Sequence, residues 1–207
     1  MLKVYGSIRT RTFRVIWTAE ELGISFEHIP TDPKAGESRT PEFLLKNPYG
    51  KVPVIDDDGF LLFESAAICT YLADKFPEKQ LTPKAYTQDR AIFDQWLSFI
   101  ITELEQGLWT IAKHTFALPE TKRIAQMREI GQWEFARAAK ALNTGLKDRS
   151  FLVGERFTVA DILAGNCLIW AIRSEVPLGY PRLEDYLERL QQRPAFQKAT
   201  QRRDRPH

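Results

Sequence analysis

The chain has 207 residues, of which 43% are hydrophobic and 27% are charged, and its net charge is +2. This composition is ordinary for a soluble globular protein with a sizeable core. The charges are spread along the sequence and form no concentrated basic run, so we expect no nucleic-acid partner.

Cysteine and histidine, the residues that form disulfides and most metal sites, are few in this chain. Two cysteines, Cys69 and Cys167, are too few for a disulfide framework, and three scattered histidines suggest no metal site. The first residues, MLKVYGS, lack a basic region followed by an apolar one, so we expect no signal peptide. The longest apolar run, Val159 to Ile172, contains polar residues and is too short to span a bilayer. We therefore expect a cytoplasmic protein with no metal and no membrane association.

The first part of the chain alternates between strand and helix patterns. Leu2 to Tyr5 and the stretch SFEHIP predict strands on either side of a helix that runs from Phe13 to Leu22. VPVI and FLLF flank DDDG, which predicts a β-hairpin with an Asp-Gly turn. Both hairpin strands are apolar throughout, so we expect their sheet to be covered on both faces.

The pattern of predicted secondary structure changes after the helix predicted for ESAAICTYLADKF. A polar segment with two prolines follows, and beyond it the patterns are helical only: Ala91 to Phe116, Thr121 to Leu146, Val159 to Ile172, Leu183 to Leu190 and a short helix opened by Pro194. We predict an α/β domain over residues 1–78, a linker over 79–86 and an all-helical domain over 87–207. The basic tail QRRDRPH is interpreted as a frayed, solvated terminus.

Polar side chains crowd the junction between the first strand and the first helix. They are Ser7, Thr10, Arg11 and Thr12. A hydroxyl here caps the helix by accepting a backbone N–H, or donates its proton to a ligand. The residues alone leave both roles open.

Two separated stretches carry a resemblance to a known family. NPYGKVPVIDDDGFLLFESAAICTYL resembles the glutathione-binding half of cytosolic glutathione S-transferases, and FTVADILAGNCLIWA resembles the capping-box helix of their second half. The order of the motifs is also the family's, so the similarity covers nearly the whole chain. It implies a thioredoxin-like N-terminal domain, an all-α C-terminal domain and a homodimer. The implied activity is detoxification, in which the glutathione thiolate is conjugated to small hydrophobic electrophiles.

The resemblance also implies which residues hold glutathione. Pro53 would follow a cis peptide bond, and the backbone of Val52 would then pair with the cysteine unit of glutathione as an added strand does. Ser65, at a helix N-terminus, would hold the γ-glutamyl carboxylate, and Glu64 its ammonium group. The plainer alternatives are a proline that starts a strand and a pair of residues that cap a helix.

The glycine carboxylate of glutathione is assigned to Lys51, whose alternative is a solvated surface lysine. Many relatives reach the same carboxylate with a histidine earlier in the loop. A gapless comparison places Ser38 at that position.

The catalytic hydroxyl follows from one further motif. Theta-like, delta-like and bacterial relatives carry Ser-x-x-x-Arg at the first helix, and here Arg14 matches the arginine, so Thr10 matches the serine. A hydrogen bond from Thr10 would stabilise the thiolate, which is the nucleophile. Ser7 and Tyr5 are the alternative donors, and Arg11 could add electrostatic stabilisation. No cysteine lies in this turn, which argues against thiol–disulfide exchange.

Other residues receive weaker assignments. Thr158 and Asp161 fit a capping box, a structural motif. The electrophile would meet residues drawn from Ile8, Trp109, His114 and Phe116, unless these are core, and Glu103 or Glu105 of a partner subunit could join the γ-glutamyl network. A glutathione-dependent peroxidase, isomerase or dehalogenase and a non-catalytic binding protein remain the alternative functions.

Overall fold

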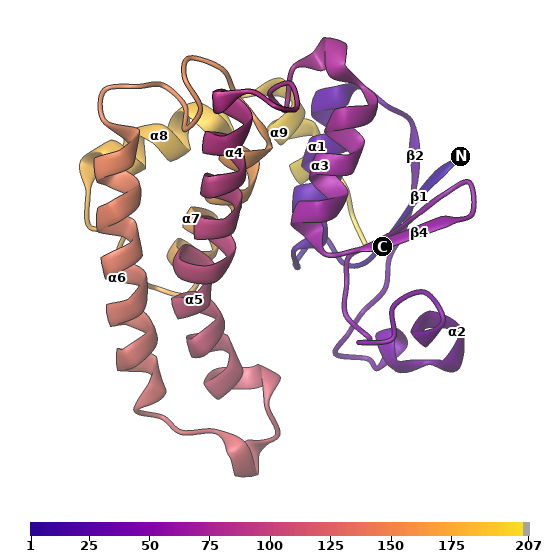
Figure 1. Cartoon of the computed structure of the whole chain (residues 1–207). Coiled ribbons are helices and arrows are strands. Elements are labelled where there is room, and N and C mark those ends of the chain that lie inside the picture. The colour runs from indigo at the N-terminus through magenta and orange to yellow at the C-terminus, as the bar shows by residue number, and fades with distance from the viewer. Residues whose placement is uncertain (205–207) are drawn as a thin grey trace. The chain divides into compact units, whose positions relative to one another are not determined.

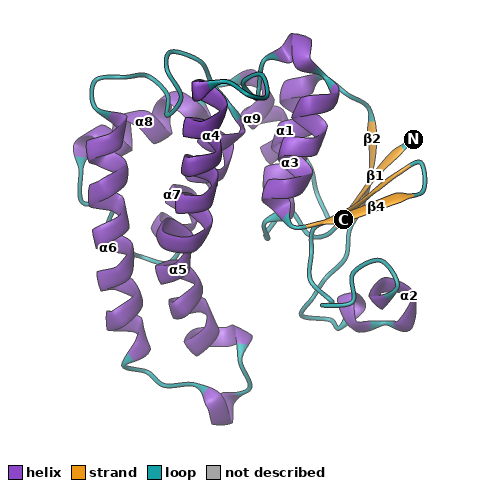
Figure 2. Ribbon diagram, viewed as in Figure 1, coloured by secondary structure: helices purple, strands orange, loops and turns teal. Residues whose placement is uncertain are grey.

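The computed structural model describes residues 1–204, and its helices and strands are drawn in Figure 1. The chain divides into two compact units. One comprises Met1–Thr82 together with the segment that starts at Gln191, and the other is Pro83–Leu190. The last helix thus belongs with the first unit, whereas the sequence pattern groups it with the helical half. In Figure 2 the strands lie in the first unit and the second unit is helical, which confirms the predicted fold class.

The first unit is built on a mixed sheet with the strand order β2-β1-β3-β4. Strand β1 (Leu2–Tyr5) is parallel to β2 (Phe26–Ile29) and antiparallel to β3 (Val54–Asp57). The register pairs Tyr5 with both Ile29 and Val54. The end of β1 therefore lies beside the start of β3, and the chain leaves the sheet there toward the polar turn.

Strand β4 (Phe60–Phe63) forms the predicted hairpin with β3. Asp58 and Gly59 both have positive φ, at 52° and 94°, as a tight Asp-Gly hairpin turn requires. The expectation that both strands are covered is wrong for β4, because Phe60 is 51% exposed and Leu61 and Phe63 are also exposed. An edge strand has a neighbour on one side only, and these side chains stay exposed although the Phe60 ring contacts that of Tyr71 at a centroid distance of 5.4 Å.

Helices α1 (Thr12–Leu22) and α3 (Ser65–Lys75) lie side by side in Figure 1 and pack against each other. The last helix, α9 (Pro194–Gln201), also packs on α1. Phe196 of α9 places its ring edge-on to Phe13 and Trp17 of α1, with centroid distances of 5.6 and 4.9 Å. Because α1 is covered by neighbours on several sides, nearly all its side chains are buried. The short helix α2 is Pro41–Leu44.

Asp57 ties the sheet to α3, since its carboxylate accepts hydrogen bonds from Lys75 and, at 2.7 Å, from the Tyr71 hydroxyl. These hydrogen bonds lower the pKa of Asp57. A lowered pKa in the folded state means that the contribution to stability is present above the unfolded pKa of about 3.9 and is lost as the pH falls. We expect Asp57→Asn to reduce the free energy of unfolding by less than about 1 kcal/mol near neutral pH, because the Lys75 side chain of the pair is 42% exposed and solvent screens the interaction. Urea unfolding at several pH values checks this, and a difference that grows toward acid pH would contradict it.

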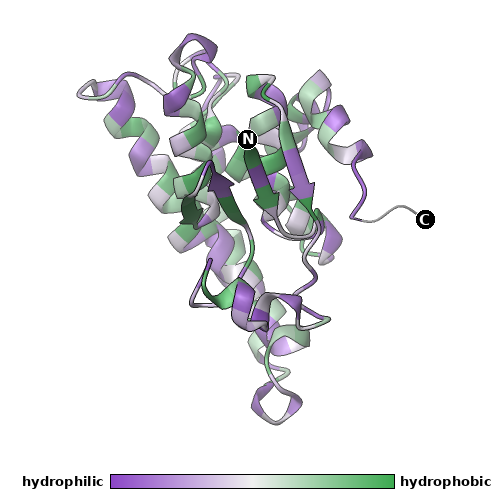
Figure 3. Ribbon diagram, turned by 90° about the vertical axis from the view of Figure 1, so that its right-hand side faces the viewer, coloured by the Kyte–Doolittle hydropathy of each residue, from purple (hydrophilic) through white to green (hydrophobic). Residues whose placement is uncertain are grey.

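The second unit consists of helices, most of which bury one face. The first is continuous from Gln88 to Ala117: α4 (Gln88–Phe99) and α5 (Glu105–Ala112) alternate with two π-helical segments, Ile100–Leu104 and Lys113–Ala117. Helix α6 (Met127–Leu146) packs against α5, and α8 spans Pro181–Gln191. Hydrophobic and hydrophilic residues alternate along the helical ribbons in Figure 3, as the period of an amphipathic helix produces.

Helix α7 (Val159–Arg173) confirms the buried helix predicted from the longest apolar run. It begins with the predicted capping box, in which Asp161 accepts the backbone N–H of Thr158 at 2.8 Å. The same buried carboxylate accepts the Leu152 backbone N–H at 2.9 Å and the Tyr186 hydroxyl at 2.7 Å. A side chain on α8 and a loop residue are thus fixed to the start of α7. Within residues 1–204, each helix is too short or too polar to cross a lipid bilayer.

The tail is ordered in its first part, so its interpretation as a frayed terminus is wrong up to Asp204. Arg202 donates two hydrogen bonds to Glu20, at 2.6 and 2.9 Å, and its guanidinium lies 4.1 Å from the ring centroid of Phe26. Charged and aromatic partners on the first unit hold this segment. Residues 205–207 lie outside the described residues.

Candidate functional site

The polar turn and the loop before β3 meet at Gly6. This residue has a φ of 137°, and a Cβ added to it would lie 2.0 Å from Thr12 Oγ1 and 2.9 Å from Val52 Cβ. Only a residue without a side chain permits this approach. The close packing at Gly6 places the hydroxyls of the turn next to Val52.

Thr10 is the half-buried hydroxyl of the turn, whereas Thr12 is fully buried. Thr10 Oγ1 donates to the Ser7 carbonyl at 2.7 Å. It accepts the Thr12 backbone N–H at 3.2 Å and lies 2.9 Å from Thr12 Oγ1, which therefore supplies its own proton to that contact. Thr10 caps the start of α1 in this arrangement, and its proton is the group that a ligand would redirect.

Redirecting that proton leaves the turn intact. The Ser7 carbonyl also accepts the Thr10 backbone N–H at 3.0 Å, so it retains a partner when the hydroxyl rotates away. The lost neutral hydrogen bond is worth about 0.5–1.5 kcal/mol, whereas a hydrogen bond to an anion is worth about 1.5–3 kcal/mol. An anion beside Thr10 would therefore capture the proton.

The alternative hydroxyls, those of Ser7 and Tyr5, are less available than that of Thr10 to a ligand at the turn. Ser7 is buried, and its hydroxyl donates to a carboxylate oxygen of Asp204 at 2.7 Å. Tyr5 lies within β1 instead of the turn. Arg11 is half-buried at the N-cap of α1. Of these residues, Thr10 has the most accessible hydroxyl that lies in the turn itself.

The loop before β3 has the predicted backbone, because the Val52–Pro53 peptide bond is cis. Pro53 is buried and Val52 is half-buried. Within the described part of the chain, no hydrogen bond to the Val52 backbone N–H or carbonyl is found. These two groups lie just before Val54, the first residue of β3, and are suited to pairing with an extended ligand.

Glu64 and Ser65 begin α3 as predicted. Glu64 is exposed and has a φ of 70°, an unusual conformation for a residue with a side chain. Such outliers gather at ligand sites, where the surrounding structure holds them. Ser65 Oγ accepts a hydrogen bond from the Arg14 guanidinium at 3.2 Å, and Arg14 is only 1% exposed. Arg14 thus occupies one acceptor position of the Ser65 hydroxyl, which is 4% exposed, and this contact does not use the hydroxyl proton.

The loop around Lys51 contains a second cation that the sequence analysis missed. Lys51 is half-buried with its ammonium 4.4 Å from the Tyr49 ring centroid. Arg39 donates to the Tyr49 carbonyl at 3.1 Å, and a Cβ on Gly50 would lie 2.9 Å from its guanidinium. Ser38 is only 1% exposed, so it does not present its side chain to a ligand. The only sequence signal for Arg39 was its place next to Ser38.

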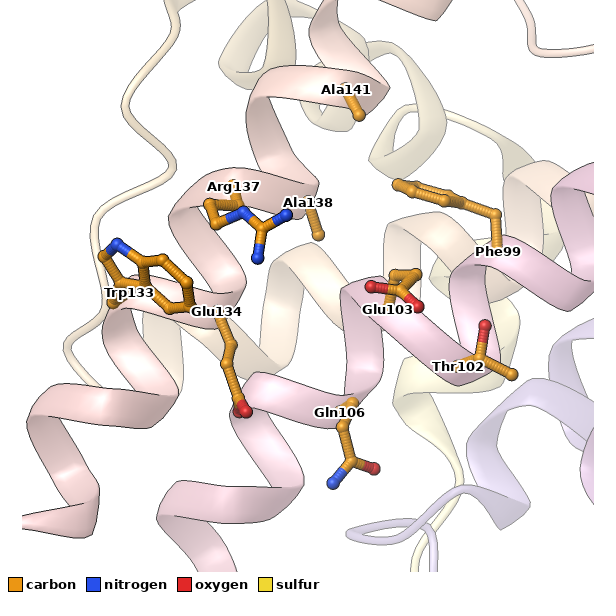
Figure 4. Close-up of a pocket in the computed structure, with 9 residues that line it drawn as sticks. All are labelled: Phe99, Thr102, Glu103, Gln106, Trp133, Glu134, Arg137, Ala138 and Ala141. Atoms are coloured by element: carbon orange, nitrogen blue, oxygen red, sulfur yellow. The ribbon is translucent and has the colours of Figure 1, made fainter.

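The helical unit has two surface cavities of about 260 Å³ each. The first lies between the α4–α5 helix and α6, and Figure 4 shows the carboxylates of Glu103 and Glu134 and the guanidinium of Arg137 around it. Phe116 lines the second, and His114 accepts the Ile124 backbone N–H at 3.2 Å. Glu105 is 7% exposed, whereas Glu103 is exposed, so Glu103 is the more available acid.

The cysteines of the chain are core residues. Cys69 and Cys167 are buried and are not disulfide-bonded, and burial raises the pKa of the Cys69 thiol to about 12. The Cys69 thiol is therefore protonated at neutral pH. Residues 1–204 contain no group of three or more His, Cys, Asp or Glu side chains that could hold a metal ion.

Family models match both halves of the chain. Residues 1–74 match the N-terminal domain of glutathione S-transferases, and residues 126–189 match their C-terminal domain. The first match includes the polar turn, the cis-proline loop and the start of α3, and the second includes α6 and α7.

Individual relatives agree with this result. The chain is 31% identical to the glutathione S-transferase GstA of Escherichia coli O157:H7, over 76% of each protein. It is 35% identical to elongation factor 1-gamma of Rattus norvegicus over 77% of this chain, but that match spans only 36% of the factor. A glutathione transferase of Phanerochaete chrysosporium, solved with oxidized glutathione, superposes with a TM-score of 0.84 at 26% identity, over 96% of this chain and 94% of that protein.

Proposed function

Because the chain belongs to the glutathione S-transferase family, we propose that it binds glutathione and transfers the thiolate sulfur to small hydrophobic electrophiles. The observation that carries the proposal is the packing at Gly6, which brings the Thr10 turn against Val52. A peptide that pairs with the Val52 backbone would place its cysteine sulfur at this turn. Glutathione, γ-Glu-Cys-Gly, is such a peptide.

The two ends of glutathione have partners on either side of Val52. The Ser65 hydroxyl and the N-terminus of α3 would hold the γ-glutamyl carboxylate, and Glu64 its ammonium. Lys51, with Arg39 beside it, would hold the glycine carboxylate. The arrangement of opposite charges matches the tripeptide along its length, which supports glutathione over a simple thiol.

Catalysis would consist of stabilising and orienting the thiolate. The hydrogen bond from Thr10 gains about 1–1.5 kcal/mol net, and the N-terminus of α1 adds about 0.3–1 kcal/mol. Together they would lower the pKa of the thiol by about one to two units from about 8.5. In a substitution the sulfur bonds to the electrophilic carbon, the leaving group departs with the bonding electrons, and the thiol proton passes to water.

A homodimer is part of this proposal. The exposed Phe60, Leu61 and Phe63 of β4 form an apolar edge that a second copy would cover. Sedimentation of the wild-type chain tests the dimer. Replacement of Phe60 by Lys should shift the equilibrium toward monomer.

The test of binding is calorimetry with glutathione. We expect the wild type to bind, and Ser65→Ala to weaken affinity by about tenfold, the equivalent of one hydrogen bond to a carboxylate. The matched control is Ser98→Ala, an exposed helix serine whose hydroxyl bonds only to the Asp94 carbonyl. No binding by the wild type at millimolar glutathione would favour a non-catalytic role, which the similarity to elongation factor 1-gamma brings into consideration.

The type of reaction is tested separately. A panel of electrophiles, hydroperoxides and halogenated substrates with glutathione distinguishes conjugation from peroxidase, isomerase or dehalogenase chemistry. We expect conjugation, since the turn stabilises a glutathione thiolate and contains no cysteine. Turnover of hydroperoxides alone would replace this assignment while leaving the glutathione site in place.

A further inference from the structure

Asp204 lies far from the polar turn in sequence but contacts it directly. One carboxylate oxygen accepts the Ser7 hydroxyl at 2.7 Å, and the other accepts the Ile8 backbone N–H at 2.8 Å. Hydrogen bonds to an ionised carboxylate are roughly twice as strong as those between neutral groups. Two successive residues of the turn are therefore held by one side chain.

These contacts extend to Thr10 through Ser7. The Ser7 hydroxyl oxygen also accepts the Arg9 backbone N–H at 3.1 Å, so the orientation imposed by Asp204 fixes a further peptide group. The Ser7 carbonyl accepts both the side chain and the backbone N–H of Thr10. A shift of Ser7 would consequently move the acceptor that sets the resting position of the Thr10 hydroxyl.

The segment that carries Asp204 is anchored independently of the turn. Arg193 donates to both carboxylate oxygens of Glu21, at 2.6 and 2.7 Å. Arg202, two residues before Asp204, is bonded to Glu20 and stacked on Phe26. Because both acids lie at the end of α1, the same helix that starts at the turn also fixes the segment that returns to it.

We propose that Asp204 is a positioning residue, which holds the Ser7–Thr10 turn in the conformation from which the Thr10 hydroxyl reaches the glutathione sulfur. The inference rests on the proposed function, because it assigns Asp204 to that same site. Asp204 touches neither the sulfur nor the electrophile and acts through Ser7 and Ile8.

The test compares three variants of the full chain: Asp204→Ala, Asp204→Asn and Arg203→Ala. Arg203 is the matched control, because it is exposed and its guanidinium donates to carbonyls of its own segment. We expect Asp204→Ala to lower kcat by about 3- to 10-fold while the KM for glutathione changes less than about twofold, since Ser65 and Val52 are untouched. Asp204→Asn keeps one acceptor oxygen and should recover part of the loss, and Arg203→Ala should match the wild type.

Two further readouts separate positioning from a general loss of stability. The absorbance of the bound thiolate, titrated against pH, should shift to higher pH in Asp204→Ala and not in Arg203→Ala. Amide exchange at Ile8 should accelerate in Asp204→Ala, because its N–H loses the carboxylate. A change in unfolding free energy without these shifts would overturn the proposal.

The remaining outcomes are equally decisive. Equal kcat and thiolate titration in wild type and Asp204→Ala would overturn the positioning role while leaving the transferase in place. Faster turnover in Asp204→Ala would also overturn it, because Asp204 would then be withholding the Ser7 hydroxyl and the Ile8 N–H from the sulfur. Failure of the wild type to bind glutathione would contradict the proposed function itself. That result is separate from the comparison of variants, which concerns the role of Asp204 alone.

Discussion

Thr10→Ala is expected to lower turnover at neutral pH by about 10- to 100-fold, the equivalent of one hydrogen bond to an anion. The alanine removes the donor that would face the sulfur, so the pKa of the bound thiol rises toward its free value of about 8.5. The deficit should shrink as the pH rises past that value, because the thiol then ionises without assistance. Steady-state kinetics and thiolate absorbance over the same pH range measure both effects.

Two substitutions at the same position make this prediction specific. Thr10→Ser keeps the hydroxyl and should retain most of the activity, whereas Thr10→Val keeps the shape and should behave like Thr10→Ala. Thr10 also accepts the Thr12 backbone N–H, so losing it is expected to reduce stability by about 1 kcal/mol, as for other helix caps. Unfolding measurements show whether each variant is folded under assay conditions. An unchanged thiolate absorbance in Thr10→Val at neutral pH would refute the catalytic role.

Local patterns predicted most elements of the fold, although α6 begins at Met127 and not at Thr121. Alternating apolar residues, the Asp-Gly turn and the capping box each act within a few residues, and the hairpin and α7 followed them. The residues proposed to bind glutathione were predicted instead from the order of separated motifs. Their chemistry depends on close approach between segments, such as Gly6 against Val52, which no local pattern expresses.

The features that the sequence analysis did not predict share a physical cause: each depends on what lies against a residue in the folded protein. The exposure of β4 depends on what packs over it, and the sequence of an apolar strand does not distinguish a buried strand from an edge strand that a partner covers. Asp204 contacts Ser7 across 197 positions in the chain, so only the path of the folded chain reveals the pair. The sequence places a hydroxyl at the turn, but whether its proton is donated to the Ser7 carbonyl or to a ligand depends on one rotatable bond.

Asp161→Ala is expected to reduce the free energy of unfolding by about 3–5 kcal/mol, which is near the upper end for a single substitution. The buried carboxylate is the acceptor for two backbone N–H groups and the Tyr186 hydroxyl, and alanine would leave these donors without that partner. Each buried unsatisfied group is unfavourable by about 1–3 kcal/mol, and some relaxation reduces the sum. Denaturant unfolding measures the change.

Matched variants identify the network as the source of this loss. Asp185→Ala removes an exposed carboxylate one residue from Tyr186 and should change stability by less than about 0.5 kcal/mol. Tyr186→Phe removes one donor and leaves the two backbone N–H groups bonded to Asp161, so its effect should be smaller than that of Asp161→Ala. If Asp161→Ala does not fold, Tyr186→Phe still measures the network. Because the start of α7 is a structural capping motif, affinity for glutathione should be retained in folded Asp161 variants, and a loss of affinity with stability unchanged would show that Asp161 belongs to the site.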